Sequence, residues 1–207
     1  MATEKEVISD WLQAFPLLKR YKSGRKLLRR FEFLVFGVEL EKVRFDNEIY
    51  RPNFVALNLL ASRPVFSLNR VLKNKDRSIY GVPYKKHEEL FQDAVQLMKS
   101  QAPPFFENDI VAPNDVLLMY QEEMKRQINN GSSPLSSWIS LIRIAGYLGN
   151  EELRDGEMRL MLDYVGKLPP ESLTLYGDFK KFVNNEIYID KREFEERMAA
   201  NLVLLGF

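Results

Sequence analysis

Apolar side chains recur at helical spacing from the start of the chain. Thr3 and Glu6 have the spacing of a capping box, and apolar residues then follow every three or four positions until Pro16. This pattern predicts an amphipathic helix over residues 4–14. Trp11 falls on its apolar stripe, where aromatic residues usually belong to the core.

The pattern changes after the basic stretch that follows this helix. Residues 31–60 are rich in Phe, Val, Ile and Tyr, and part of the segment alternates apolar with polar positions. Residues of this kind favour strands. We therefore predict strands near 31–44 and 48–59.

Two local features refine the strand prediction. Asp46 and Asn47 both tolerate a left-handed backbone, so they indicate a hairpin turn between the strands. Pro52 cannot donate a ladder hydrogen bond, which places the second strand at a sheet edge or starts it after this residue. Residues 61–85 fit a short helix or strand followed by a loop.

The remainder of the chain has the spacing of consecutive helices. Apolar stripes occur at residues 90–98, 116–128, 135–148 and 153–165. Each stripe is followed by Pro or Gly, residues that end helices. Two shorter helices are predicted near 172–184 and 190–203, the second with Asp190 as its N-cap.

These elements predict an α+β fold. An N-terminal helix and a β-hairpin or small antiparallel sheet would pack against a C-terminal array of about five helices. The length of 207 residues fits a single domain, 1–207. Within it, a basic, strand-containing half (1–86) precedes an acidic, mostly helical half (87–207).

The connector that begins with Pro103 and Pro104 is unusually apolar. Phe105 and Phe106 follow the two prolines and could be core residues or an aromatic anchor for a partner. We favour core packing.

Charge is distributed very unevenly along the chain. Residues 16–86 carry 17 Lys and Arg against 6 Asp and Glu, whereas residues 87–207 carry 12 against 20. The net charge of +1 conceals this division. A concentration of positive charge attracts acidic macromolecules.

Two stretches hold most of this positive charge. The second contains Arg63, Arg70, Lys73, Lys75, Arg77, Lys85 and Lys86. The first stretch is denser and supplies most of the candidate partner-binding residues. Arg51, which precedes Pro52 at a predicted strand break, is added to them. These are Lys19, Arg20, Lys22, Arg25, Lys26, Arg29, Arg30 and Arg51. The alternative is that these cations are solvated or paired with dispersed acidic groups, with little effect on binding.

Few residues are available for catalysis or metal binding. The chain has no cysteine and one histidine, His87, which we expect to be an exposed residue in the first turn of a helix. No phosphate loop, nucleophile elbow, zinc or calcium motif is present. We therefore predict no catalytic residues, metal or cofactor, and regard an enzyme as the less favoured class.

The pattern as a whole favours a cytoplasmic interaction protein that binds an acidic partner through its basic half. An adaptor, or a bacterial immunity protein that covers a toxin's surface, would fit such a chain. A protein partner is favoured over nucleic acid because no nucleic-acid-binding motif accompanies the charge. The alternatives are nucleic-acid binding by the same residues and an enzyme whose site forms only in the fold. We expect no membrane association, since no apolar run reaches the ~18 residues of a span.

Overall fold

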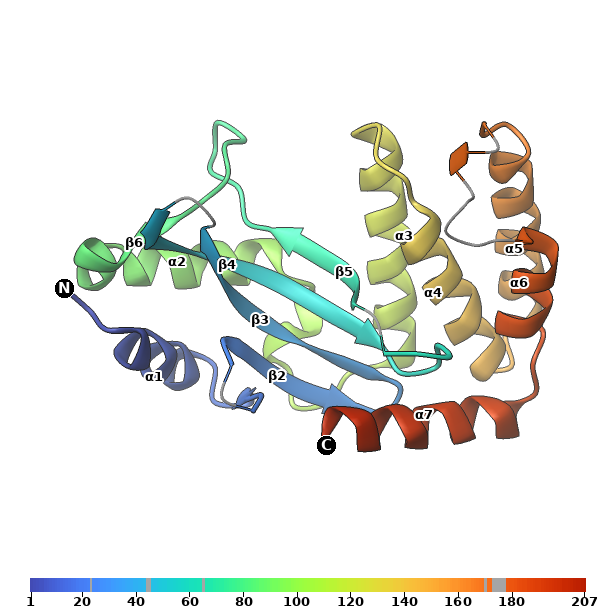
Figure 1. Cartoon of the computed structure of the whole chain (residues 1–207), viewed down its shortest axis with the longest axis horizontal. Helices are drawn as coiled ribbons and strands as arrows, with labels where there is room; N and C mark the ends of the chain where they lie inside the picture. Colours follow the sequence, from blue (N-terminus) through green and yellow to red (C-terminus); the bar gives the residue numbers. More distant parts are fainter. Residues whose placement is uncertain (23, 44–45, 65, 170, 173–177) are drawn as a thin grey trace. The chain divides into compact units, whose positions relative to one another are not determined.

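The computed structural model describes the chain except for residues 23, 44–45, 65, 170 and 173–177 (Figure 1). The described residues form two compact units. Unit 1 comprises residues 1–57 and 68–112, and unit 2 comprises residues 58–67 and 113–207. The predicted α+β class is confirmed, with an N-terminal helix, an antiparallel sheet and C-terminal helices.

Unit 1 begins with helix α1 (Glu4–Ala14), at the predicted position. The Thr3 side chain accepts a hydrogen bond from the Glu6 amide, and the Glu6 carboxylate accepts one from the Thr3 amide. This reciprocal pair satisfies amides that the first helical turn leaves without partners. The buried face of the helix contains Val7, Ile8 and Trp11.

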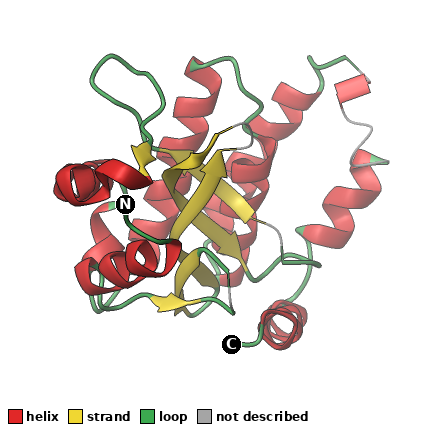
Figure 2. Cartoon of the chain, turned by 60° about the vertical axis from the view of Figure 1, so that its left-hand side comes forward, coloured by secondary structure: helices red, strands yellow, loops and turns green. Residues whose placement is uncertain are grey.

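The sheet contains six described strands, which form a twisted surface (Figure 2). They are β1 (Lys19–Arg20), β2 (Lys26–Phe31), β3 (Leu34–Val43), β4 (Asp46–Asn58), β5 (Phe66–Val71) and β6 (Val82–Pro83). The order is β1-β2-β3-β4-β5, and β6 pairs with β4. Strands β1 and β5 are therefore the two ends of the main path.

The strand boundaries differ from the prediction in two places. A separate strand, β2, precedes residue 31, because Leu27 and Leu28 are buried between charged neighbours that obscure the apolar pattern. Asp46 and Asn47 belong to β4 rather than to a turn. Residues 44–45, which precede them, lie outside the described part of the chain.

Pro52 is not at an edge, because β4 has β3 on one side and both β5 and β6 as further neighbours. Strand β6 pairs only with Ile49 and Tyr50 of β4. Pro52 follows this pairing, so its missing N–H removes no hydrogen bond to β6.

Aromatic rings fill the core between the sheet and the helical elements of unit 1. Helix α2 (His87–Gln101) follows the 3₁₀ turn η1 (Tyr84–Lys86), and the connector forms η2 (Pro104–Glu107). The rings of Phe36 and Phe54 both contact Phe106, and Phe36 also contacts Phe105. Phe105 and Phe106 are buried, so the core role predicted for the connector is confirmed.

Unit 2 is largely helical. Its helices are α3 (Pro113–Asn129), α4 (Leu135–Tyr147), α5 (Glu151–Val165), α6 (Phe179–Glu186) and α7 (Lys191–Leu205). The first three agree closely with the predicted stripes, and Asp190 caps α7 as expected. Helix α6 begins later than the predicted 172, and part of that prediction lies outside the described residues. No described helix is long and apolar enough to cross a membrane.

Candidate partner-binding surface

The densest basic segment folds as the β1–β2 hairpin. The Tyr21 amide donates to the Lys26 carbonyl over 2.8 Å, and the Gly24 amide donates to the Tyr21 carbonyl over 3.2 Å. Lys22 has φ 51° in this tight turn, a left-handed conformation that non-glycine residues seldom adopt. Its ammonium lies 5.1 Å from the centre of the Tyr21 ring.

Strand register divides the basic residues between the two faces of the sheet. Lys19 is opposite Leu28 and Arg20 is opposite Leu27. Successive side chains on a strand point to opposite faces. Lys19, Lys26 and Arg30 therefore share one face, whereas Arg20 and Arg29 share the other.

Arg25 and Lys26 form ion pairs within unit 1. Arg25 pairs with Glu4 of α1, and Lys26 pairs with Glu39, its partner in the β2–β3 register. The hydrogen bond from Arg25 lowers the pKa of the Glu4 carboxyl. These two cations are partly neutralised by the fold itself.

Arg29 binds the backbone of its own unit. Its two terminal nitrogens donate to the carbonyls of Asn108 and Asp109 over 2.7 and 3.2 Å. Its guanidinium carbon lies 5.1 Å from the centre of the Phe36 ring. This side chain therefore supports the structure around η2.

Four cations of the hairpin remain on its surface, and we call them the edge patch. They are Lys19, Arg20, Lys22 and Arg30, all exposed. Residues 16–31 contain no Asp or Glu to oppose them. Arg20 Nε and Arg30 Nε donate to backbone carbonyls, which orients the guanidinium groups, and Arg20 also interacts electrostatically with Glu4. The patch surrounds β1, which is one end of the sheet's main path.

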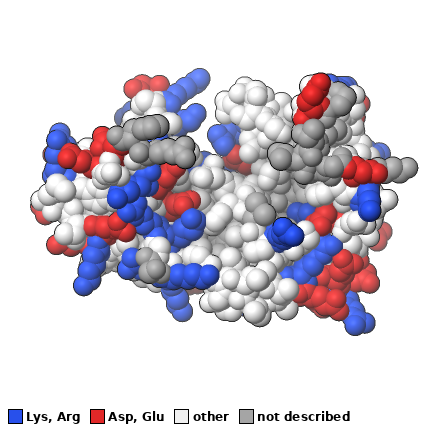
Figure 3. Space-filling model, in the orientation of Figure 1, with Lys and Arg blue, Asp and Glu red and all other residues white. Residues whose placement is uncertain are grey.

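Figure 3 shows Lys and Arg gathered over the strand part of unit 1, with Asp and Glu interspersed among them. The visible face is therefore not uniformly positive.

Arg51 lies apart from the edge patch, in β4, and is half-buried. Its neighbour Asn53 is buried, and its Nδ2 donates to Glu41 over 3.1 Å. Within the described residues, Asn53 Oδ1 has no hydrogen-bond partner. Of the predicted partner-binding residues, Arg51 is therefore left out of the edge patch.

The second basic stretch does not extend the edge patch. Arg63 belongs to unit 2, whereas Arg70 and the later cations belong to unit 1. The loop at residues 73–79 follows β5, at the opposite end of the main strand path from β1 (Figures 1 and 2).

His87 is buried, with 2% exposure, and the prediction of an exposed histidine is wrong. It begins α2 as expected, but its ring is directed into the core of unit 1. Nδ1 lies 2.9 Å from the Tyr50 hydroxyl, and Nε2 lies 2.9 Å from Asp10 Oδ2. Sequence reasoning missed this cluster because its members are far apart in the chain and no motif spacing connects them.

The polar groups of the array around His87 are bonded to one another. Trp11 Nε1 donates to the Tyr50 hydroxyl over 3.4 Å, so the ring and hydroxyl are already engaged. Burial raises the pKa of Tyr50 far above its usual value, which keeps the hydroxyl neutral. We interpret the array as a structural hydrogen-bond network.

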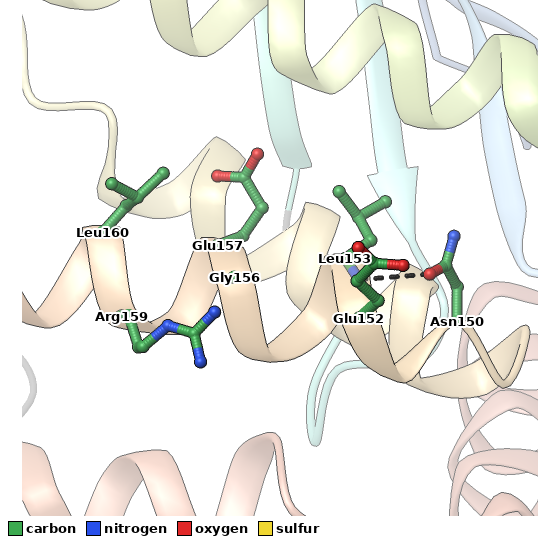
Figure 4. A pocket seen from close by; sticks show the side chains of 7 residues that line it. All are labelled: Asn150, Glu152, Leu153, Gly156, Glu157, Arg159 and Leu160. Atoms are coloured by element: carbon green, nitrogen blue, oxygen red, sulfur yellow. Dashed lines mark hydrogen bonds between the residues drawn. The ribbon is translucent and has the colours of Figure 1, made fainter.

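A pocket of about 600 Å³ lies along α5 (Figure 4). All its lining residues come from this helix and its N-cap, Asn150, which accepts a hydrogen bond from the Leu153 amide over 3.1 Å. Glu157 accepts a hydrogen bond from Trp138 Nε1 over 2.8 Å. Because no second element among the described residues supplies facing groups, this pocket is a hollow on the surface of α5.

The described residues also contain no group of three or more His, Asp or Glu side chains that could hold a metal ion. No protein-family model matches the chain, and neither the curated proteins nor the solved structures include a match.

Proposed function

We propose that this chain is a non-catalytic interaction protein of the cytoplasm whose edge patch binds an acidic protein segment. The observation that carries the proposal is the exposure of four cations on a hairpin segment without any carboxylate of its own. Like charges held close together repel one another, and an acidic partner relieves that repulsion. Such complementarity mainly increases the association rate and selects among partners.

The hairpin separates supporting cations from available ones. Arg25, Lys26 and Arg29 hold unit 1 together, so their removal would change the fold as well as the charge. Lys19, Lys22 and Arg30 extend from the surface. The conformation of Lys22, with φ 51°, is further support, because strained backbone often accompanies function.

The small number of exposed cations, and the acidic side chains mixed with basic ones on the same unit, favour a protein partner over nucleic acid. Strongly salt-dependent duplex binders neutralise about 6 to 10 phosphates. The edge patch offers four cations, and the face shown in Figure 3 mixes acidic with basic side chains over the strand part of unit 1. An acidic peptide segment requires fewer contacts. An adaptor, or an immunity protein that covers a toxin, remains within this proposal.

The proposal is tested by charge reversal in the edge patch. The test variant is Lys19→Glu/Lys22→Glu/Arg30→Glu, and the matched control is Lys5→Glu/Lys125→Glu/Lys181→Glu, which reverses three exposed cations elsewhere. The probe is a fluorescein-labelled poly-glutamate peptide, followed by fluorescence anisotropy. We expect the test variant to lose at least about tenfold in affinity, since reversal replaces attraction by repulsion.

The control variant should retain most of the affinity, because its substitutions lie outside the edge patch. Its net charge equals that of the test variant, so any effect of net charge alone is the same in both. Equal losses in the two variants would overturn the proposal. Labelled single- and double-stranded DNA and RNA form the comparison. Tighter binding of these probes than of poly-glutamate would overturn the proposal in favour of nucleic-acid binding.

A further inference from the structure

A pocket of about 320 Å³ lies wholly within unit 2 and is unrelated to the edge patch. It is lined by the β4–β5 connection and by residues of α4 and α6. The lining residues are Asn58, Ala61, Ser62, Arg63, Ser67, Ser136, Ile139, Ser140, Arg143 and Phe182. Four hydroxyls, an amide and two guanidinium groups are thus combined with two large apolar side chains.

Arg143 is the buried charge of this pocket, with 7% exposure. Its Nη2 donates to a Glu186 carboxylate oxygen, and its Nε donates to the Glu186 carbonyl over 3.2 Å. A guanidinium has five N–H donors, and Glu186 engages two of its nitrogens, Nε and Nη2. Because Arg143 also lines the pocket, its remaining donors are the ones that a ligand could use.

The charges around Arg143 do not cancel. Glu186 also accepts from Arg197 Nη1 over 3.1 Å, and Arg197 pairs in turn with Glu193. The described lining contributes two arginines, Arg63 and Arg143, against the Glu186 carboxylate that Arg143 binds, which leaves one positive charge at the pocket. Burial lowers the pKa of Arg143 despite the adjacent Glu186, so the desolvation of its charge is only partly offset.

The hydroxyl groups are held by a second buried network. The Tyr120 hydroxyl contacts the hydroxyls of Ser67 and Ser140. Asn58 Nδ2 donates to the Ser140 carbonyl over 3.2 Å, and Asn58 Oδ1 accepts from the Leu60 amide over 2.9 Å. These bonds fix the connection against α4 and give the pocket a defined polar wall.

We propose that this pocket binds a small monoanionic carboxylate that carries an apolar group. The carboxylate would accept hydrogen bonds from Arg143 and from the hydroxyls of Ser62 and Ser136, the two exposed serines of the lining. The apolar group would contact Ile139 and Phe182. The planar edge of the Arg143 guanidinium matches the geometry of a carboxylate. The single negative charge of the ligand matches the one positive charge that is left at the pocket. The volume is at the lower end of those of ligand pockets, which limits the ligand to a small molecule.

The experiment is titration of the full chain with acetate, butyrate and benzoate, followed by NMR chemical shifts. Benzamide, which has the shape of benzoate without its charge, and inorganic phosphate are the comparison ligands. We expect saturable binding of benzoate and butyrate, weaker binding of acetate, and no binding of benzamide. Binding of phosphate alone would overturn the carboxylate assignment, and failure of all three carboxylates to bind would overturn the site.

Two variants locate the binding without disturbing the buried ion pair. Ser136 is exposed at the pocket, so Ser136→Phe fills it and should weaken benzoate binding by at least about tenfold through steric exclusion. Ser133→Phe is the control, since Ser133 is exposed but does not line the pocket. Arg63→Gln should weaken binding about fivefold at most, as expected for an exposed charge. Equal affinities of the Ser136 and Ser133 variants would contradict the proposal.

Discussion

The Tyr50 hydroxyl oxygen lies 2.9 Å from Nδ1 of His87 in the core of unit 1. Trp11 Nε1 can only donate, and it donates to this same hydroxyl. The other ring nitrogen of His87, Nε2, lies 2.9 Å from Asp10 Oδ2. Four side chains from α1, β4 and α2 are connected in this way, so the network ties both helices to the sheet.

Removal of the Tyr50 hydroxyl tests this network. Tyr50→Phe leaves Trp11 Nε1 and His87 Nδ1 buried without a partner, and an unsatisfied buried polar group costs about 1–3 kcal/mol. We expect the free energy of unfolding, measured by urea denaturation, to fall by that amount. Tyr188→Phe is the control, because Tyr188 is 50% exposed and should change stability by less than about 0.5 kcal/mol. Equal stability of the two variants would show that the network contributes nothing.

The Arg25–Glu4 pair predicts a dependence of stability on pH. The pKa of Glu4 is lower in the folded protein than in the unfolded chain, chiefly because Arg25 donates a hydrogen bond to it. Its contribution is thus complete above the unfolded value of about 4.3 and is lost as the pH falls through the folded pKa. Glu4→Gln should destabilise the protein at neutral pH and converge with the unchanged protein in acid. A difference that is constant across thermal melts from pH 7 to pH 3 would refute this role.

Phe105 and Ile110 are close in sequence but opposite in exposure. Phe105 is 1% exposed and contacts Phe36, whereas Ile110 is 84% exposed. Phe105→Ala should cost about 3–5 kcal/mol, because it leaves a cavity in the aromatic core. Ile110→Ala should remain within about 0.5 kcal/mol of the unchanged protein. If chemical denaturation found the two variants alike, the connector would not be part of the core.

Gly37 permits the close approach of β2 and β3. A Cβ atom at this position would lie 1.9 Å from the Leu27 carbonyl oxygen. Gly37→Ala should therefore lower stability by about 1–3 kcal/mol through overpacking. Gly156→Ala is the matched substitution, since a Cβ there meets nothing within 4 Å and the position is helical. It should raise stability by about 0.5–1 kcal/mol. Thermal melts that shift in the same direction for both would contradict this account of the strand pair.

Helix positions were largely predictable because an amphipathic helix has apolar residues on its buried face at every third or fourth position. The capping box of Thr3, the cap at Asp190 and the stripes of α2 to α5 are all local patterns of this kind. Strand β2 was missed because its buried leucines lie between Lys26 and Arg29. The position of Pro52 inside the sheet depends on which residues of β4 pair with β6. Local sequence patterns do not show this pairing.

The candidate surface was predictable only as a set of charges. The sequence shows the seven cations of the first basic stretch but cannot show that Glu4 and Glu39 neutralise two of them. These pairs join residues 21 and 13 positions apart. The burial of His87 likewise depends on Tyr50 and Asp10, which are 37 and 77 residues distant. Pairing between residues far apart in sequence decides which charged groups remain available to a partner. Rules based on residue spacing do not predict this pairing.

The central claim is that the edge patch binds an acidic segment through a few exposed cations. The most direct measurement is the affinity of the full chain for labelled poly-glutamate across a series of salt concentrations, compared with the Lys19→Glu/Lys22→Glu/Arg30→Glu variant. Screening weakens exposed charge pairs, so the account predicts affinity that falls steadily with salt and is nearly absent in the variant. Affinity that is insensitive to salt, or equal in the two proteins, would contradict it.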